Sequence, residues 1–203
     1  MDAKRLLFIS FFLFFQGATT QKAILIFGDS ITAGYGLSPD QAYPAILNKK
    51  LSDLHKNYKV IGSGLSGETS AGGLSRIDWI LRQPVDIFIL ELGANDGLRG
   101  LPLEETQKNL QAIIDKVKTK YPTVKIVIAG MMVPPNMGPA YTEKFKKIFP
   151  DLAKKNNATL IPFLLQDVAG NEKLNQADGI HPTASGHKIL AENVYKAITP
   201  LLN

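Results

Sequence analysis

Ser30 stands at a position in this sequence that suits nucleophilic chemistry. It follows the apolar run 23–27 and Gly28, so it is expected on a tight turn just past the end of a buried strand. In open α/β sheets, ligands bind at that edge. A serine hydroxyl is a weak nucleophile until a base removes its proton. The pattern therefore predicts a serine nucleophile and requires a base from elsewhere in the chain.

His181 is the candidate for that base. It lies shortly after Asp178, in a turn that contains Gly179 and Pro182. At this spacing a carboxylate can hold one imidazole nitrogen while the other nitrogen accepts a proton. The same three-residue spacing also fits a purely structural turn. The hypothesis therefore depends on the groups that other strand ends supply.

Acyl transfer also needs hydrogen-bond donors where negative charge develops on the substrate oxygen. Gly67 can offer its backbone N–H and Asn95 its side-chain amide, and both follow expected strands. The backbone N–H of Ser30 is a third candidate. Taken singly, Gly67 also suits a plain turn, and Asn95 suits a helix cap or an Asx turn. Their joint occurrence at strand ends favours an oxyanion hole.

Four short blocks of the sequence carry a family resemblance. In order and spacing they resemble the four blocks of the SGNH (GDSL) hydrolases. They are most similar to the bacterial multifunctional acyl thioesterase, lysophospholipase and arylesterase group of that family. The resemblance covers essentially the whole chain after the N-terminal segment. The blocks are 28–32, 66–70, 93–97 and 178–182.

The resemblance implies a role for each candidate residue. Ser30 would be the nucleophile, His181 the base and Asp178 the acid that orients it. Gly67 and Asn95 would donate to the oxyanion beside the Ser30 N–H. No cofactor is implied. The sequence departs from the pattern at position 68, where it has Glu and many relatives of this group have Asp, and in the loop 134–138. The second departure bears on substrate preference.

The elements that must position these residues alternate along the chain. Strands and helices alternate five times, which predicts a parallel sheet covered by helices on both faces. We therefore expect a three-layer α/β/α fold with a five-stranded, flavodoxin-like sheet, in a single domain over 21–203. Trp79 is expected in a core-facing helix. The expected strands are 23–27, 59–61, 86–92, 124–129 and 158–163, and the expected helices are 41–54, 73–82, 103–120, 142–155 and 184–198.

The loop 131–139 is long and apolar, and it is a candidate lining for an acyl chain. Methionines fill cores as readily as flexible pockets, so a packing role is equally compatible with the pattern. The expected substrate is a small acyl ester or a lipid. The residues expected to contact it are Asp29, Met132, Pro134, Met137 and Ile180.

Residues 1–20 are typical of a secretory signal peptide. A basic start at 4–5 precedes the apolar segment 6–15, which is too short to span a bilayer comfortably. Small residues follow at 17–20 and place the cleavage site there approximately. We therefore expect an exported enzyme, periplasmic or secreted.

Composition limits the possible partners and cofactors. The net charge is +5, but the lysines occur without an aromatic or arginine-rich recognition motif, which argues against a nucleic-acid partner. At most, weak contact with membrane surfaces is expected, and nothing demands an oligomer. The chain has no cysteine and only three scattered histidines, so no metal site is expected. A monomer without cofactor or metal is predicted.

Two alternative functions stay open at this point. Gly62-x-Gly64-x-x-Gly67 fits a dinucleotide-binding pattern after a strand, although it follows the second strand and not the first. The same SGNH residues would also suit a carbohydrate O-acetyl esterase, because function depends on the site and not on the fold.

Overall fold

The computed structural model describes residues 20–202, so residues 1–19 of the predicted signal peptide lie outside the described part. The strands form one parallel sheet in the order β2-β1-β3-β4-β5. This confirms the predicted five-stranded sheet. Its strands are β1 (Lys22–Gly28), β2 (Tyr58–Gly64), β3 (Ile87–Glu91), β4 (Lys125–Ala129) and β5 (Thr159–Ile161).

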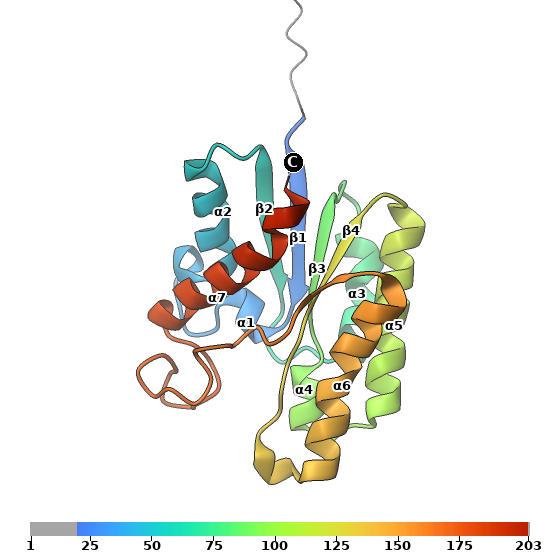
Figure 1. Cartoon of the computed structure of the whole chain (residues 1–203), viewed down its shortest axis with the longest axis vertical. Coiled ribbons are helices and arrows are strands. Elements are labelled where there is room, and N and C mark those ends of the chain that lie inside the picture. The colour runs from blue at the N-terminus through green and yellow to red at the C-terminus, as the bar shows by residue number, and fades with distance from the viewer. Residues whose placement is uncertain (1–19, 203) are drawn as a thin grey trace, which may run out of the picture.

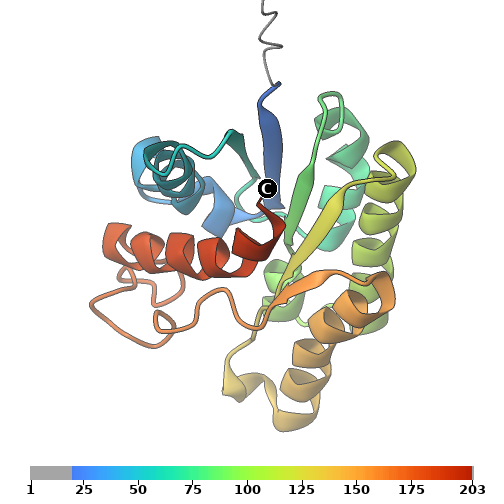
Figure 2. The same cartoon turned by 45° about the horizontal axis from the view of Figure 1, so that its top comes forward.

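Helices cover both faces of the sheet, which makes the three predicted layers (Figure 1). One face carries α2 (Tyr43–Asp53) and α7 (Ala184–Ile198), and the other carries α3 (Ser70–Ile80), α5 (Leu103–Lys120) and α6 (Pro139–Asn156). Figure 2 shows the same division from another angle. Two short helices, α1 (Ser30–Ala33) and α4 (Ala94–Leu98), follow β1 and β3, and 3-10 turns occur at Pro39–Gln41, Pro135–Met137 and Thr199–Leu201.

The core lies on both sides of the two central strands, β1 and β3. Every residue of β3 is buried, as are the last five residues of β1. Strands covered on both faces read as continuous apolar runs, which explains why these two were recognisable in the sequence. Helix α5 adds the predicted apolar stripe, and its members are fully or almost fully buried: Leu110, Ile113, Ile114 and Val117.

Helix α3 faces the core as predicted, but Trp79 does not. Gly73 and Ile77 are buried on its inner side, whereas 63% of Trp79 is exposed. Two residues along a helix turn the side chain by about 200°, so Trp79 points away from the face that Ile77 buries. Its ring lies beside the guanidinium of Arg82, at 5.8 Å.

The segments that follow β1 and β3 differ from the plain turns that were expected. Each is followed by a one-turn helix, α1 or α4. In α1 the Asp29 carboxylate accepts the Ile31 N–H at 3.1 Å, and Gly34 ends the helix with a φ of 72°. These helices place Ser30 and Asn95 in the first turn after their strands.

Two features are absent from residues 20–202. No helix there combines the length and apolar character that crossing a bilayer requires. In the same residues, no group of three or more His, Cys, Asp or Glu side chains is arranged to hold a metal ion.

Candidate active site

The three predicted triad side chains form one hydrogen-bonded series. Ser30 Oγ lies 2.9 Å from His181 Nε2, and His181 Nδ1 lies 2.6 Å from Asp178 Oδ2. Ser30 is 9% exposed, and the His181 and Asp178 side chains are 18% and 38% exposed. The serine and the imidazole are thus largely shielded, while the carboxylate at the far end of the series meets solvent.

A long loop carries Asp178 and His181 between β5 and α7. Asp178 Oδ1 accepts the N–H groups of Ile180 and His181, at 2.9 and 3.0 Å. The backbone N–H and the imidazole of His181 are the main reasons why the pKa of Asp178 falls to about 2, with the Ile180 N–H adding to them. Gln176 ties this loop to the nucleophile loop by donating to the Tyr35 carbonyl at 2.7 Å. The Tyr35 ring lies against the His181 ring, with 4.5 Å between centroids.

A buried network lies beneath the nucleophile turn. Glu91 ends β3 with no exposed surface, and its Oε2 accepts the Thr32 hydroxyl at 2.6 Å and the Asp29 N–H at 3.3 Å. Tyr43 continues the network through a 2.8 Å contact with Thr32. Burial, together with nearby Asp29, raises the pKa of Glu91 well above its usual range, which favours the neutral acid. Gly28 leaves room for this carboxyl, since a Cβ there would come within 2.2 Å of Glu91 Oε2.

The candidate oxyanion donors lie in two adjoining turns. Asn95 Nδ2 donates to Asp29 Oδ2 at 3.2 Å and to the Glu68 carbonyl at 3.1 Å, so both amide hydrogens are engaged. Gly67 has a φ of 77°, in a turn closed by the Glu68 N–H on the Leu65 carbonyl. These contacts bring Asn95 beside the residue that precedes Ser30 and beside the residue that follows Gly67.

A sequence profile of the GDSL-like Lipase/Acylhydrolase family matches residues 26–189, which spans all of these groups. The chain belongs to the GDSL-like lipase/acylhydrolase family. The predicted membership of this hydrolase family is thereby confirmed.

Relatives and solved structures of the GDSL-like family support the assignment. Esterase TesA of Pseudomonas aeruginosa is 39% identical over 188 residues, which cover 92% of each chain. Thioesterase 1/protease 1/lysophospholipase L1 of Escherichia coli is 36% identical over 187 residues, covering 92% of this chain and 88% of that protein. A crystal structure of TesA matches with a TM-score of 0.85 at 38% identity, over 89% of this chain and 100% of that chain. The predicted fold class is confirmed by this match.

The side chains expected to contact substrate in this GDSL-like chain differ in exposure. Met132 and Ile180 are 39% and 46% exposed, Pro134 is exposed and Met137 is half-buried. Asp29 is only 1% exposed, and its carboxylate is occupied by Ile31 and Asn95. This burial argues against the expected substrate contact and favours a role in positioning Asn95.

The Asp29 carboxyl also has a raised pKa. Burial raises its pKa to about 6, and Glu68 adds to the rise. The Ile31 N–H, His181 and the Asn95 amide oppose it. The backbone N–H of Asp29 donates to Glu91, and its carboxylate accepts from Asn95. Asp29 therefore connects the buried network to a candidate oxyanion donor.

The glycines of the possible dinucleotide motif have a packing role in the GDSL-like fold. Gly62 and Gly64 belong to β2 itself and not to a turn that opens a helix. A Cβ on Gly64 would come within 2.2 Å of the Ala33 nitrogen, and one on Gly62 within 3.1 Å of Pro44. The close approach of α1 and α2 to the edge strand explains the pattern, so the dinucleotide alternative is not favoured.

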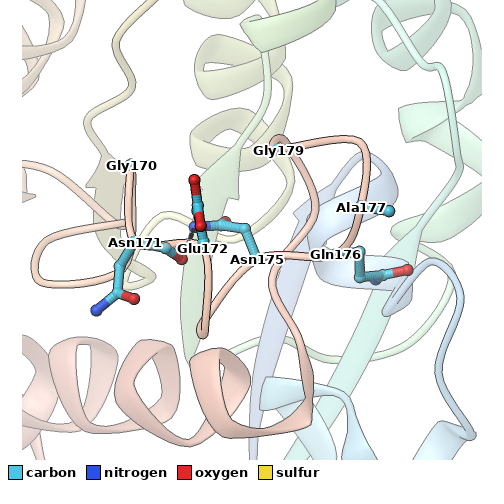
Figure 3. Close-up of a pocket in the computed structure, with 7 residues that line it drawn as sticks. All are labelled: Gly170, Asn171, Glu172, Asn175, Gln176, Ala177 and Gly179. Carbon is cyan, nitrogen blue, oxygen red and sulfur yellow. Dashed lines mark hydrogen bonds between the residues drawn. The ribbon is translucent and has the colours of Figure 1, made fainter.

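A pocket of about 480 Å³ opens on the loop that carries the acid and the base (Figure 3). The lining is largely polar, and it includes neither Ser30 nor His181, so we assign it no part in the chemistry. Its lining residues are Gly170, Asn171, Glu172, Asn175, Gln176, Ala177 and Gly179.

Sequence reasoning missed two groups near the site, the buried Glu91 with its partner Thr32 and the half-buried Arg76 with its partner Glu68. One signal could have revealed Glu91, since it is the only charged residue of an otherwise apolar strand, β3. A carboxyl buried on both faces of a sheet needs a polar partner. Nothing local marks Arg76, whose partners come from other segments.

Proposed function

We propose that this chain is a serine ester hydrolase that cleaves carboxylic esters or thioesters. The observation that carries the proposal is the series from Ser30 Oγ through the His181 imidazole to the Asp178 carboxylate. Such a series couples a hydroxyl to a base and the base to an orienting acid. Among the described residues no metal cluster competes for the role.

In the first step Ser30 Oγ attacks the substrate carbonyl carbon while His181 Nε2 takes the hydroxyl proton. A tetrahedral intermediate forms with a negative oxygen. When it collapses, the bond to the leaving oxygen or sulfur breaks, and His181 gives its proton to that atom. An alcohol or thiol departs, and the acyl group stays on Ser30 Oγ as an ester.

In the second step water attacks the acyl-serine and His181 takes a proton from it. Collapse releases the carboxylic acid, and the proton returns to Ser30 Oγ. Asp178 remains ionised throughout, because its pKa is lowered to about 2, and it stabilises the imidazolium in both steps.

The oxyanion in both steps would accept hydrogen bonds from the backbone N–H groups of Ser30 and Gly67 and from the Asn95 amide. Both hydrogens of that amide are engaged with Asp29 and Glu68. Asn95 would therefore donate to the oxyanion through a hydrogen that it shares with Asp29 or Glu68. Rigid donors of this kind act without reorganising during the reaction, which is why they contribute strongly to the rate.

The expected substrates are aryl esters, lysophospholipids or acyl thioesters. The names of the two relatives, an esterase and a thioesterase/lysophospholipase, support these classes. The acyl chain would contact Met132, Met137 and Ile180. All three lie in segments that follow the carboxyl ends of strands, and their apolar side chains are exposed or half-buried. These similarities do not favour the carbohydrate O-acetyl esterase.

The test of the proposed function is a panel of substrates offered to the purified chain. The panel contains p-nitrophenyl esters from acetate to palmitate, a long-chain acyl-CoA, lysophosphatidylcholine and acetylated xylan. We expect hydrolysis in at least one of the first three classes, together with labelling of Ser30 by a fluorophosphonate, located by mass spectrometry. Absence of both, or labelling at another residue, would exclude the proposal. Hydrolysis of acetylated xylan alone would instead indicate the O-acetyl esterase.

Met137→Gln is expected to discriminate between acyl chains. The thioether is half-buried in the 3-10 turn after β4, and a polar amide would be poorly matched to an alkyl chain. We expect kcat/KM for p-nitrophenyl octanoate to fall roughly tenfold, while the acetate ester is almost unaffected. Leu54→Gln is the control, since Leu54 is 47% exposed at the far end of α2. Equal losses on both esters would contradict the acyl-chain role.

Export stays a proposal, as do the monomeric state and the absence of a nucleic-acid partner. The basic and apolar pattern of residues 1–20 supports removal of a signal peptide in this segment.

A further inference from the structure

Arg76 of α3 joins the ends of two strands next to the site. Its Nη2 donates to the carbonyls of Gly28 and Ser63, at 3.3 and 3.0 Å, and its Nη1 donates to Ser63 Oγ at 2.9 Å. The guanidinium also lies 4.2 Å from the centre of the Phe27 ring. One side chain thus holds the carboxyl end of β1, which leads to the nucleophile, against the end of β2.

The same guanidinium binds the Glu68 carboxylate through two contacts. Arg76 Nε donates to Glu68 Oε1 at 2.6 Å, and Arg76 Nη2 donates to Glu68 Oε2. The two side chains are 21% and 2% exposed. A two-pronged arginine–carboxylate contact fixes orientation as well as distance. Removing Arg76 would leave the Glu68 charge buried without this compensation.

Glu68 is also the residue whose main chain lies between the two candidate oxyanion donors. Its carbonyl accepts Asn95 Nδ2 at 3.1 Å, and its N–H closes the turn that contains Gly67. The Gly67 carbonyl is held separately by Arg99 at 2.9 Å. The side chain of Glu68 is thus anchored by Arg76 while its backbone positions Asn95 and Gly67.

We propose that Arg76 and Glu68 act as a positioning pair that holds Gly67 and Asn95 at the correct distance from Ser30 for oxyanion binding. The inference rests on the proposed function and deepens it. Neither side chain touches a reacting atom. Donors displaced by a fraction of an ångström lose stabilisation of the tetrahedral state while ground-state binding is kept. The loss should therefore appear in kcat and not in KM.

The test compares Glu68→Gln, Arg76→Gln and the double variant with the unmodified enzyme on one good p-nitrophenyl ester. Each single variant should lower kcat by about tenfold to hundredfold and leave KM within about twofold. The double variant should be no worse than the singles, because the two side chains act as one unit. Asp78→Asn is the matched control, since Asp78 lies on the same helix in an exposed ion pair with Lys116.

A boronic acid inhibitor separates positioning from simple loss of folded enzyme. It forms a tetrahedral adduct on the nucleophile, whose oxygen occupies the oxyanion hole, so its inhibition constant should weaken by the same factor as kcat. Activities are normalised to the fraction of enzyme that a fluorophosphonate labels. Arg76→Lys keeps the charge and loses the two-pronged contact, so it should fold and show an intermediate loss.

Unchanged kcat in Glu68→Gln and Arg76→Lys would overturn the inference. A fall in kcat with unchanged boronate affinity, or one fully explained by the labelled fraction, would overturn it as well. These outcomes differ from failure of the proposed function, in which the unmodified enzyme hydrolyses no ester and is not labelled at Ser30.

Discussion

Ser30→Ala is expected to lower kcat on every hydrolysed ester by about 10⁴-fold or more. The hydroxyl oxygen is the atom that would carry the acyl group, and alanine offers no replacement for it. Ser30 Oγ lies 2.9 Å from His181 Nε2 and forms no other side-chain hydrogen bond among the described residues, so the fold should be preserved. Steady-state hydrolysis, thermal unfolding and mass spectrometry of trapped acyl-enzyme measure the effect.

The matched control is Ser52→Ala, because Ser52 is an exposed serine near the end of α2. This control should keep full activity and an unchanged melting temperature. Hydrolysis by Ser30→Ala at more than about one-hundredth of the normal rate would contradict a serine mechanism. Residual activity below that level is compatible with the oxyanion donors and binding alone.

Asp178→Asn is expected to lower kcat by about 10⁴-fold while the loop keeps its shape. The asparagine oxygen can still accept the N–H groups of Ile180 and His181 that now contact Asp178 Oδ1. The amide nitrogen, however, would face His181 Nδ1 with a donor. His181 would then carry its proton on Nε2, where it cannot accept one from Ser30. Steady-state kinetics across pH measure this loss.

The pH dependence of that loss is itself a prediction. Hydrogen bonds from His181 and Ile180 lower the pKa of Asp178 to about 2, so the carboxylate stays ionised from about pH 4 upward. The deficit of Asp178→Asn should therefore be constant over that range. The matched control is Asp167→Asn, an exposed residue of the same loop with a φ of 64°, which asparagine tolerates. A deficit that disappears within that range, above about pH 4, would contradict an ionised acid.

Much of the fold was predictable from local pattern. The apolar runs of β1 and β3 mark strands buried on both faces, and the stripe of α5 has helical spacing. Strand ends could be read in the same way, because each apolar run stops at a glycine or a polar group. The contact between Asp178 and His181 was also predictable, since a single turn brings together residues this close in sequence.

The direction in which a side chain points within an element was harder to predict from the sequence. Trp79 lies on a helix that was expected from the sequence, yet it is 63% exposed, because burial depends on which face meets the sheet. The glycines at 62 and 64 fit a nucleotide-binding pattern, but packing of α1 and α2 against β2 explains them. Local sequence is compatible with both explanations in such cases.

The amino-acid sequence by itself determined the five strands and the five long helices, because these follow from apolar periodicity, and it marked Ser30, Gly67 and Asn95 near strand ends. Only the tertiary structure decided how they meet. Ser30 and His181 are 151 positions apart, and two strands, β3 and β4, separate β1 from β5. The two residues meet because the parallel strands all end at one edge of the sheet, and the long loop between β5 and α7 carries His181 back along that edge to the end of β1. The contacts of Arg76 and Asn95 depend on the same assembly, because Arg76 donates to the Gly28 carbonyl and Asn95 to the Asp29 carboxylate, both at the end of β1.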